Sequence, residues 1–140
     1  MSLPVRACAW CLNQRRTGLR VNRGLRTLDL SFNDVTEAGI AHLADALAVN
    51  RNLKFLALDS NDFGDAGTTI IAMLLRNNNA LETLTLYNND IGAAGAEALA
   101  SALKTNTGLK ELVLYHNHIG DDGALHIAKV RKNNKSTTVG

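Results

Sequence analysis

The sequence predicts an α/β solenoid, in which parallel strands form the inner sheet of a short horseshoe arc and helices cover its outside. The first observation is a 28-residue repeat that occurs four times between residues 25 and 136. The second is that seven columns of this repeat hold the same residue in every copy, and they start at Leu25, Leu28, Leu30, Asn33, Gly39, Ala44 and Asn50. The third is a change of apolar period inside each copy, from two to that of a helix. A unit that is half strand and half helix cannot bury both apolar faces alone, so the copies must stack.

Each repeat opens with a short predicted strand. Leu28 and Leu30 alternate with other residues, and the alternation recurs in every copy. A period of two places the leucines on one face of a sheet and the intervening residues on the other. The leucines are therefore expected to point inward against the helices.

A helix is predicted in the second half of each repeat, because residues such as Ile40, Leu43 and Leu47 follow helical spacing. The expected N-caps are Thr36, Gly64, Gly92 and Gly120. The alanine column at Ala44 keeps neighbouring helices close. Asn50 and its equivalents lie where each helix ends, and asparagine tolerates the left-handed backbone conformation that such an end needs.

A structural ladder is predicted from the asparagines that follow each strand: Asn33, Asn61, Asn89 and Asn117. At this point the chain turns and its backbone polar groups enter the interior. An amide side chain has both donors and acceptors, so it can satisfy those groups and bridge to the next repeat.

The repeat from Leu81 to Leu103 resembles a leucine-rich repeat of the 28-residue ribonuclease-inhibitor-like subtype. That subtype is found in ribonuclease inhibitor, in the Ran GTPase-activating protein and in NOD-like receptors. The resemblance covers residues 25–134 and implies a horseshoe fold that binds other proteins. The repeats lack the cysteines of ribonuclease inhibitor, and the chain lacks the phosphate-binding loop of NOD-like receptors.

The expected organisation is a basic leader or partial N-terminal cap helix over residues 1–24, four repeats, and a tail over residues 137–140. The repeats span residues 25–52, 53–80, 81–108 and 109–136. Thr137 and Gly140 stand where a fifth strand would have leucines, so no separate C-terminal cap is expected.

The candidate site lies on the sheet face that the leucines leave open. Four of the six aromatic residues are predicted there, edged by three acids. Aromatic residues in contiguous rows are typical of a protein-binding surface. The predicted partner-binding residues are Asp29, Phe32, Phe55, Asp59, Thr85, Tyr87, Glu111, Tyr115 and His116.

Other motifs carry less weight. Cys8 and Cys11 form a C-x-x-C pair without the strand and helix of a redox fold or further zinc ligands. His116 and His118 flank a ladder asparagine, so they are interpreted as loop residues, and no metal or cofactor is expected. Residues 27–128 carry a formal charge of −8 between two basic ends, which argues against a nucleic-acid partner. No apolar run is long enough to span a membrane.

The sequence therefore predicts a non-catalytic module that binds another protein through the concave face. The acids on that face favour a partner with a basic surface. The alternatives are a GTPase-activating or regulatory module of the Ran type, or a fragment of a NOD-like receptor. A cytoplasmic location is expected, with targeting to an organelle through the Arg-rich N-terminus as the alternative.

Overall fold

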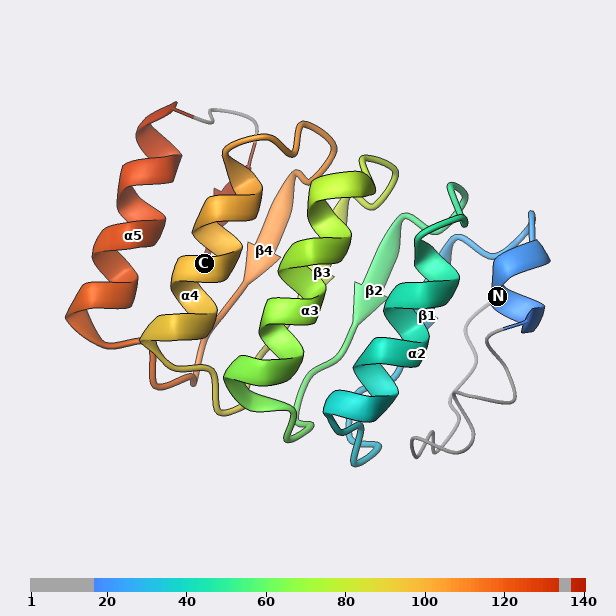
Figure 1. Ribbon diagram of the computed structural model, residues 1–140, viewed down its shortest axis with the longest axis horizontal. Coiled ribbons are helices and arrows are strands. Elements are labelled where there is room, and N and C mark those ends of the chain that lie inside the picture. The colour runs from blue at the N-terminus through green and yellow to red at the C-terminus, as the bar shows by residue number, and fades with distance from the viewer. Residues whose placement is uncertain (1–16, 134–136) are drawn as a thin grey trace.

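The computed structural model describes residues 17–133 and 137–140, and it confirms the α/β solenoid. Strands and helices alternate along the chain (Figure 1). The elements are β1 (Thr27–Asp29), α2 (Glu37–Leu47), β2 (Phe55–Ala57), α3 (Gly64–Asn77), β3 (Thr83–Thr85), α4 (Ala93–Leu103), β4 (Glu111–Val113), α5 (Gly120–Asn133) and β5 (Thr138–Val139).

The five strands form one parallel sheet in the order β1-β2-β3-β4-β5, and the helices lie in a single row on one side of it (Figure 1). Adjacent repeats pair in register, so Leu28, Leu56, Leu84 and Leu112 lie side by side. Packed helices need about 8–10 Å between their axes, whereas paired strands need only about 4.8 Å. The helical side is therefore the longer one, and we call the sheet face opposite the helices the concave face.

The core lies between the sheet and the helices. Its central leucines are almost completely buried, among them Leu56, Leu84 and Leu112 at 1% exposure or less. Phe63 fills the column of Val35 and Ile91 and is 3% exposed. At about 25 cal/mol per Å² of buried apolar surface, each fully buried leucine contributes roughly 2 kcal/mol.

The helix starts agree with the sequence in two repeats and differ in two. Thr36 and Gly92 are the N-caps of α2 and α4. Gly64 and Gly120 are instead the first residues of α3 and α5, with φ of 55° and 64°. This left-handed conformation favours glycine because glycine has no Cβ.

The residues expected as a tail extend the sheet. Thr138 and Val139 pair with Glu111 and Leu112, so residues 138–139 form β5. The register is one residue shorter than the 28-residue period, and Val139 rather than Gly140 stands opposite Leu112. The shorter register brings an apolar side chain to the core, against which Val139 packs.

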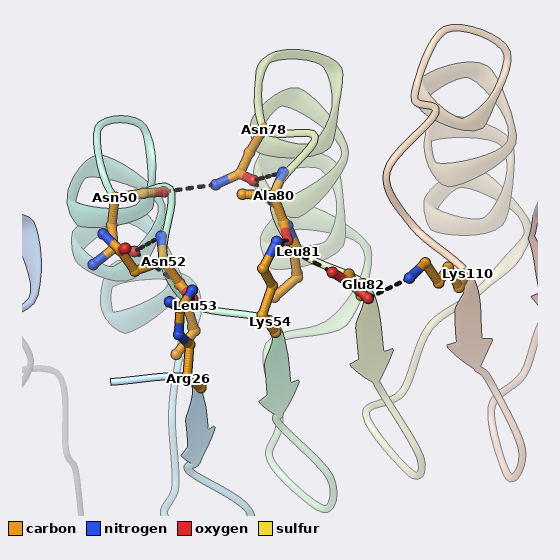
Figure 2. Close-up of polar contacts among 10 residues, drawn as sticks. All are labelled: Arg26, Asn50, Asn52, Leu53, Lys54, Asn78, Ala80, Leu81, Glu82 and Lys110. Atoms are coloured by element: carbon orange, nitrogen blue, oxygen red, sulfur yellow. Dashed lines mark hydrogen bonds and ion pairs between the residues drawn. The ribbon is translucent and has the colours of Figure 1, made fainter. Parts of the chain in front are cut away.

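The prediction of a left-handed backbone at the asparagines that end the helices is wrong for α2, α3 and α4. Asn50, Asn78 and Asn106 are at most 2% exposed and do not have positive φ. They form a second buried ladder instead (Figure 2). The amide nitrogen of Asn78 donates to the carbonyls of Leu47 and Asn50, and its oxygen accepts from the N–H groups of Ala80 and Leu81.

The same ladder reaches the N-terminal segment. Residues 17–21 are helical, and Leu19 packs against the core. The amide nitrogen of Asn50 donates to the carbonyls of Leu19 and Asn22, at 2.7 and 3.1 Å. Residues 17–22 thus dock on the first repeat as each repeat docks on the next. Residues 1–16 of the expected leader, which include Cys8 and Cys11, lie outside the described residues.

Candidate functional site

The ladder after the strands holds the turns that edge the concave face. The Asn89 side chain is completely buried, and its amide nitrogen donates to the carbonyls of Leu58 and Tyr87 at 3.0 Å. Asn117 repeats this bridge with the carbonyls of Leu86 and Leu114. Asn61 and Asn33 continue the row, so the geometry agrees with the predicted ladder role.

The strand register brings the predicted binding residues into rows across the concave face. One row runs from Thr27 through Phe55 and Thr83 to Glu111, and the next from Asp29 through Ala57 and Thr85 to Val113. In the two central strands Ala57 is only 5% exposed, whereas Phe55, Thr83 and Thr85 are partly exposed, so the middle of the face is mixed in character.

The two most exposed aromatic side chains among the described residues lie in the turns after the strands, at the rim of this face. Phe32 is 75% exposed and Tyr115 is 61% exposed. Tyr87 is half-buried, and its ring contacts that of His116 at a centroid distance of 4.9 Å and a tilted angle of 59°. Tyr87 therefore contacts His116, which follows Tyr115 in the turn after β4.

The turns after β1, β2, β3 and β4 contain a residue in the left-handed conformation, which the sequence analysis does not predict. Phe32, Ser60, Asn88 and His116 all have φ between 50° and 58°. The N–H groups of the first three donate to the carbonyls of Asp59, Tyr87 and Tyr115 in the following repeat. Asn88 and His116 in this column are the sequence signal for the left-handed turn, since asparagine and histidine are both enriched in that region.

The predicted acids and Thr85 differ in what they can offer a partner. The carboxylates of Asp29 and Asp59 each accept a backbone N–H at 2.9 Å, from Ser31 and Tyr87. Glu111 is exposed. The hydroxyl oxygen of Thr85 is buried and has no hydrogen-bond partner. Of these four polar side chains, Glu111 therefore has the charge that is most accessible to a partner.

The described residues were also compared with the requirements of a metal site and of a membrane-spanning helix. Across residues 17–133 and 137–140, no group of three or more His, Cys, Asp or Glu side chains is arranged to hold a metal ion. His118 lies at the surface, 3.5 Å from a carboxylate oxygen of Asp90. Within this part of the chain, no helix has both the length and the apolar character needed to cross a bilayer.

Comparison with family models decides the family. A model described as a leucine-rich repeat matches residues 21–44, 49–69, 77–100 and 105–128, which together make up more than half of the chain. The chain belongs to the leucine-rich repeat family. A sequence search of curated proteins finds no match for this leucine-rich repeat chain.

Two solved structures are similar to this leucine-rich repeat fold. Actin-binding site 2 of leiomodin-1 superposes with a TM-score of 0.82 at 26% identity, over 91% of this chain and 75% of that one. The tropomodulin C-terminal domain of Caenorhabditis elegans gives a TM-score of 0.81 at 14% identity, over 91% of this chain and 80% of that one. The second likeness concerns the fold alone.

Proposed function

We propose that this leucine-rich repeat chain is a non-catalytic module that binds another protein through its concave face. The observation that carries the proposal is Phe32. Its ring is 75% exposed on a backbone with φ of 58°. A large side chain in the left-handed region costs about 1–2 kcal/mol, and exposing its ring forgoes the benefit of burial. Ser60, Asn88 and His116 share this backbone conformation, so what distinguishes Phe32 is the large apolar ring that it leaves exposed.

The rest of the face suits a protein partner. Tyr115 is exposed, Tyr87 is held by its contact with His116, and Phe55 is partly exposed on β2. Exposed and partly exposed aromatic side chains match the composition of protein interfaces. The case for a basic partner surface is weaker, because the carboxylates of Asp29 and Asp59 already accept backbone hydrogen bonds.

Actin is the first partner to test. The leiomodin-1 structure that this chain resembles at 26% identity is described as an actin-binding site. The comparisons lend no support to a GTPase-activating module of the Ran type or to a NOD-like receptor fragment. The ribonuclease-inhibitor-like subtype stays a proposal that rests on the 28-residue period, and the cytoplasmic or organellar location stays a prediction.

The test measures the affinity of the purified chain for actin by cosedimentation with filaments and by fluorescence titration with monomers. Replacing both tyrosines, Tyr87→Ala with Tyr115→Ala, should abolish binding while circular dichroism stays unchanged. Phe32→Asn should weaken binding yet raise the free energy of unfolding by about 1 kcal/mol, because asparagine tolerates positive φ. A stabilised protein that has lost its partner distinguishes a binding role from a structural one.

The control replaces Glu97 and Lys129 with alanine. Both side chains line a hollow between α4 and α5 on the side of the helices, away from the concave face. This variant should bind as the wild type does. Full binding by the tyrosine variant, or loss of binding in the control, would overturn the concave-face proposal. Absence of binding by the wild type would exclude actin and leave the concave face to be tested with another partner.

A further inference from the structure

The two long edges of the solenoid carry opposite charge. One edge, at the top of Figure 1, consists of the loops from each helix to the next strand, residues 19–26, 47–54, 75–82 and 103–110. We call it the helix-to-strand edge. It has eight basic residues and one acid: Arg20, Arg23, Arg26, Arg51, Lys54, Arg76, Lys104, Lys110 and the acid Glu82.

The opposite edge consists of the loops from each strand to the next helix, residues 31–38, 59–66, 87–94 and 115–122. It has eight acids and neither lysine nor arginine: Asp34, Glu37, Asp59, Asp62, Asp65, Asp90, Asp121 and Asp122. The formal charge counted along the chain conceals this separation, because bases and acids alternate within every repeat.

Helix dipoles explain part of the pattern. Arg76 and Lys104 lie at or next to helix C-termini, where positive charge is stabilising. That effect fades beyond the last turn of a helix. It therefore does not account for Arg23, Arg26 or Lys110, which lie close to the starts of strands.

The helix-to-strand edge compensates little of its own charge. Three of its eight bases have an acidic partner: Glu82 receives Lys54, at 3.1 Å, and Lys110 (Figure 2), and Arg20 lies 3.4 Å from a carboxylate oxygen of Asp45 in α2. Arg26 donates to the carbonyl of Asn52, and such a bond leaves the guanidinium charge in place. All of the basic residues except Lys54 are exposed.

Apolar side chains accompany these charges at one end of the edge. Val21 is 67% exposed and Val49 is 45% exposed. They occupy the same position in successive 28-residue units, with Arg20, Arg23 and Arg51 close to them in the chain. The same position is Asn77 in the next repeat. The first two units thus combine positive charge with exposed apolar surface.

We propose that the helix-to-strand edge is a second binding surface, which takes an acidic protein segment that carries apolar side chains. A nucleic acid fits less well, because the four loops contain no aromatic residue on which a base could stack. Glu82 would also repel a continuous phosphate backbone. This surface is separate from the concave face and does not depend on what binds there.

The test uses three fluorescent probes with the full chain at low salt: a peptide of alternating glutamate and leucine, a peptide of glutamate alone, and single-stranded DNA. The alternating peptide should bind tightest. Reversing one charge, Arg51→Glu, should weaken its binding about tenfold, because both attraction and repulsion change. Val49→Asn, which copies Asn77 of the second repeat, should weaken binding of the alternating peptide and leave binding of the glutamate peptide unchanged.

The matched control is Lys129→Glu on α5, which changes net charge equally at an exposed site away from this edge. It should bind the alternating peptide within about twofold of the wild type. Equal losses in the Arg51 and Lys129 variants would show attraction to net charge alone and overturn the proposal. Tighter binding of the DNA, or no effect of Val49→Asn, would also overturn it.

Discussion

At the scale of single residues, the two asparagine ladders decide how the repeats are joined. Asn89 is completely buried, and its side chain connects backbone groups of consecutive repeats: it accepts the N–H of Asn61 and donates to the carbonyls of Leu58 and Tyr87. Asn106 does the same work at the other end of the repeat, where it donates to the carbonyls of Leu75 and Asn78. A buried carbonyl or N–H that loses its partner cannot recover it from water, so each rung is expensive to remove.

Replacing Asn89 with alanine should lower the free energy of unfolding by roughly 1–3 kcal/mol, because buried backbone groups lose their partner. Asn106→Ala should have an effect of similar size, measured for both variants by urea denaturation. The control is Asn77→Ala, at an exposed position in α3, which should change stability by no more than about 0.5 kcal/mol. An unchanged midpoint for both ladder variants would contradict the role of the ladders.

At the scale of elements, a contact between α3 and α4 explains one member of the glycine column. The carboxylate of Asp65, in the first turn of α3, accepts the N–H groups of Gly92 and Gly95 at 2.7 and 2.9 Å. Asp65 thus caps the helix of the next repeat. A Cβ on Gly95 would lie 2.6 Å from a carboxylate oxygen of Asp65 and 2.8 Å from Ile91, so only glycine fits.

Gly95→Ala should therefore destabilise the protein by about 1–3 kcal/mol, although alanine is the better helix former by about 1 kcal/mol. The matched control is Gly18→Ala in the N-terminal helical residues, where a Cβ meets nothing within 4 Å. That variant should be neutral or more stable. The thermal midpoints of the two variants provide the comparison, and a stabilised Gly95 variant would refute the steric account.

The ion pairs between strand starts make a separate, pH-dependent contribution. Hydrogen bonds from Lys110 and then Lys54 hold the pKa of Glu82 below its usual range. A carboxyl whose pKa is lower in the folded state stabilises the fold above its unfolded pKa and loses that contribution as the pH falls through the folded pKa.

Glu82→Gln should consequently make the free energy of unfolding depend less on pH in the acidic range. At neutral pH the variant should be slightly less stable than the wild type, and the difference should shrink as the pH falls through the acidic range. Denaturation at several pH values measures this convergence. Because Glu82 is partly exposed, added salt should also reduce the difference in stability between the variant and the wild type. A difference that grows as the pH falls would contradict the assignment.

At the scale of the whole molecule, each repeat is stabilised by its neighbours, so the ends differ from the centre. Ala72 and Ala100, on α3 and α4, are 2% exposed because another helix packs beside them. Ala128, in the same column on α5, is exposed, and Leu125 is 53% exposed. Among the described residues no helix follows α5, which explains this difference.

Hydrogen exchange should accordingly show faster amide exchange in α5 than in α3 and α4. Val139→Asp should lower protection further in α5 and β4, because Val139 packs against the core opposite Leu112. The matched control is Thr138→Asp at the neighbouring exposed position of β5, which should have little effect. Uniform protection along the solenoid would contradict nearest-neighbour stabilisation.

The sequence by itself determined the repeat, the alternation of strand and helix, and the ladder of Asn33, Asn61, Asn89 and Asn117. These features depend on local periodicity and on residues identical in every copy, which a 28-residue alignment exposes directly. The predicted binding residues remain untested by the fold, although the register shows which of them share a row.

Only the tertiary structure decided the rest, because each remaining feature depends on contacts between repeats. The left-handed turn at Phe32, the cap that Asp65 gives to α4, and the second ladder all involve a partner about 26–31 residues away. The shortened register of β5 follows from which apolar side chain reaches the core. The charged edges arise because stacking aligns equivalent loops of every repeat, which the linear order of the sequence keeps apart.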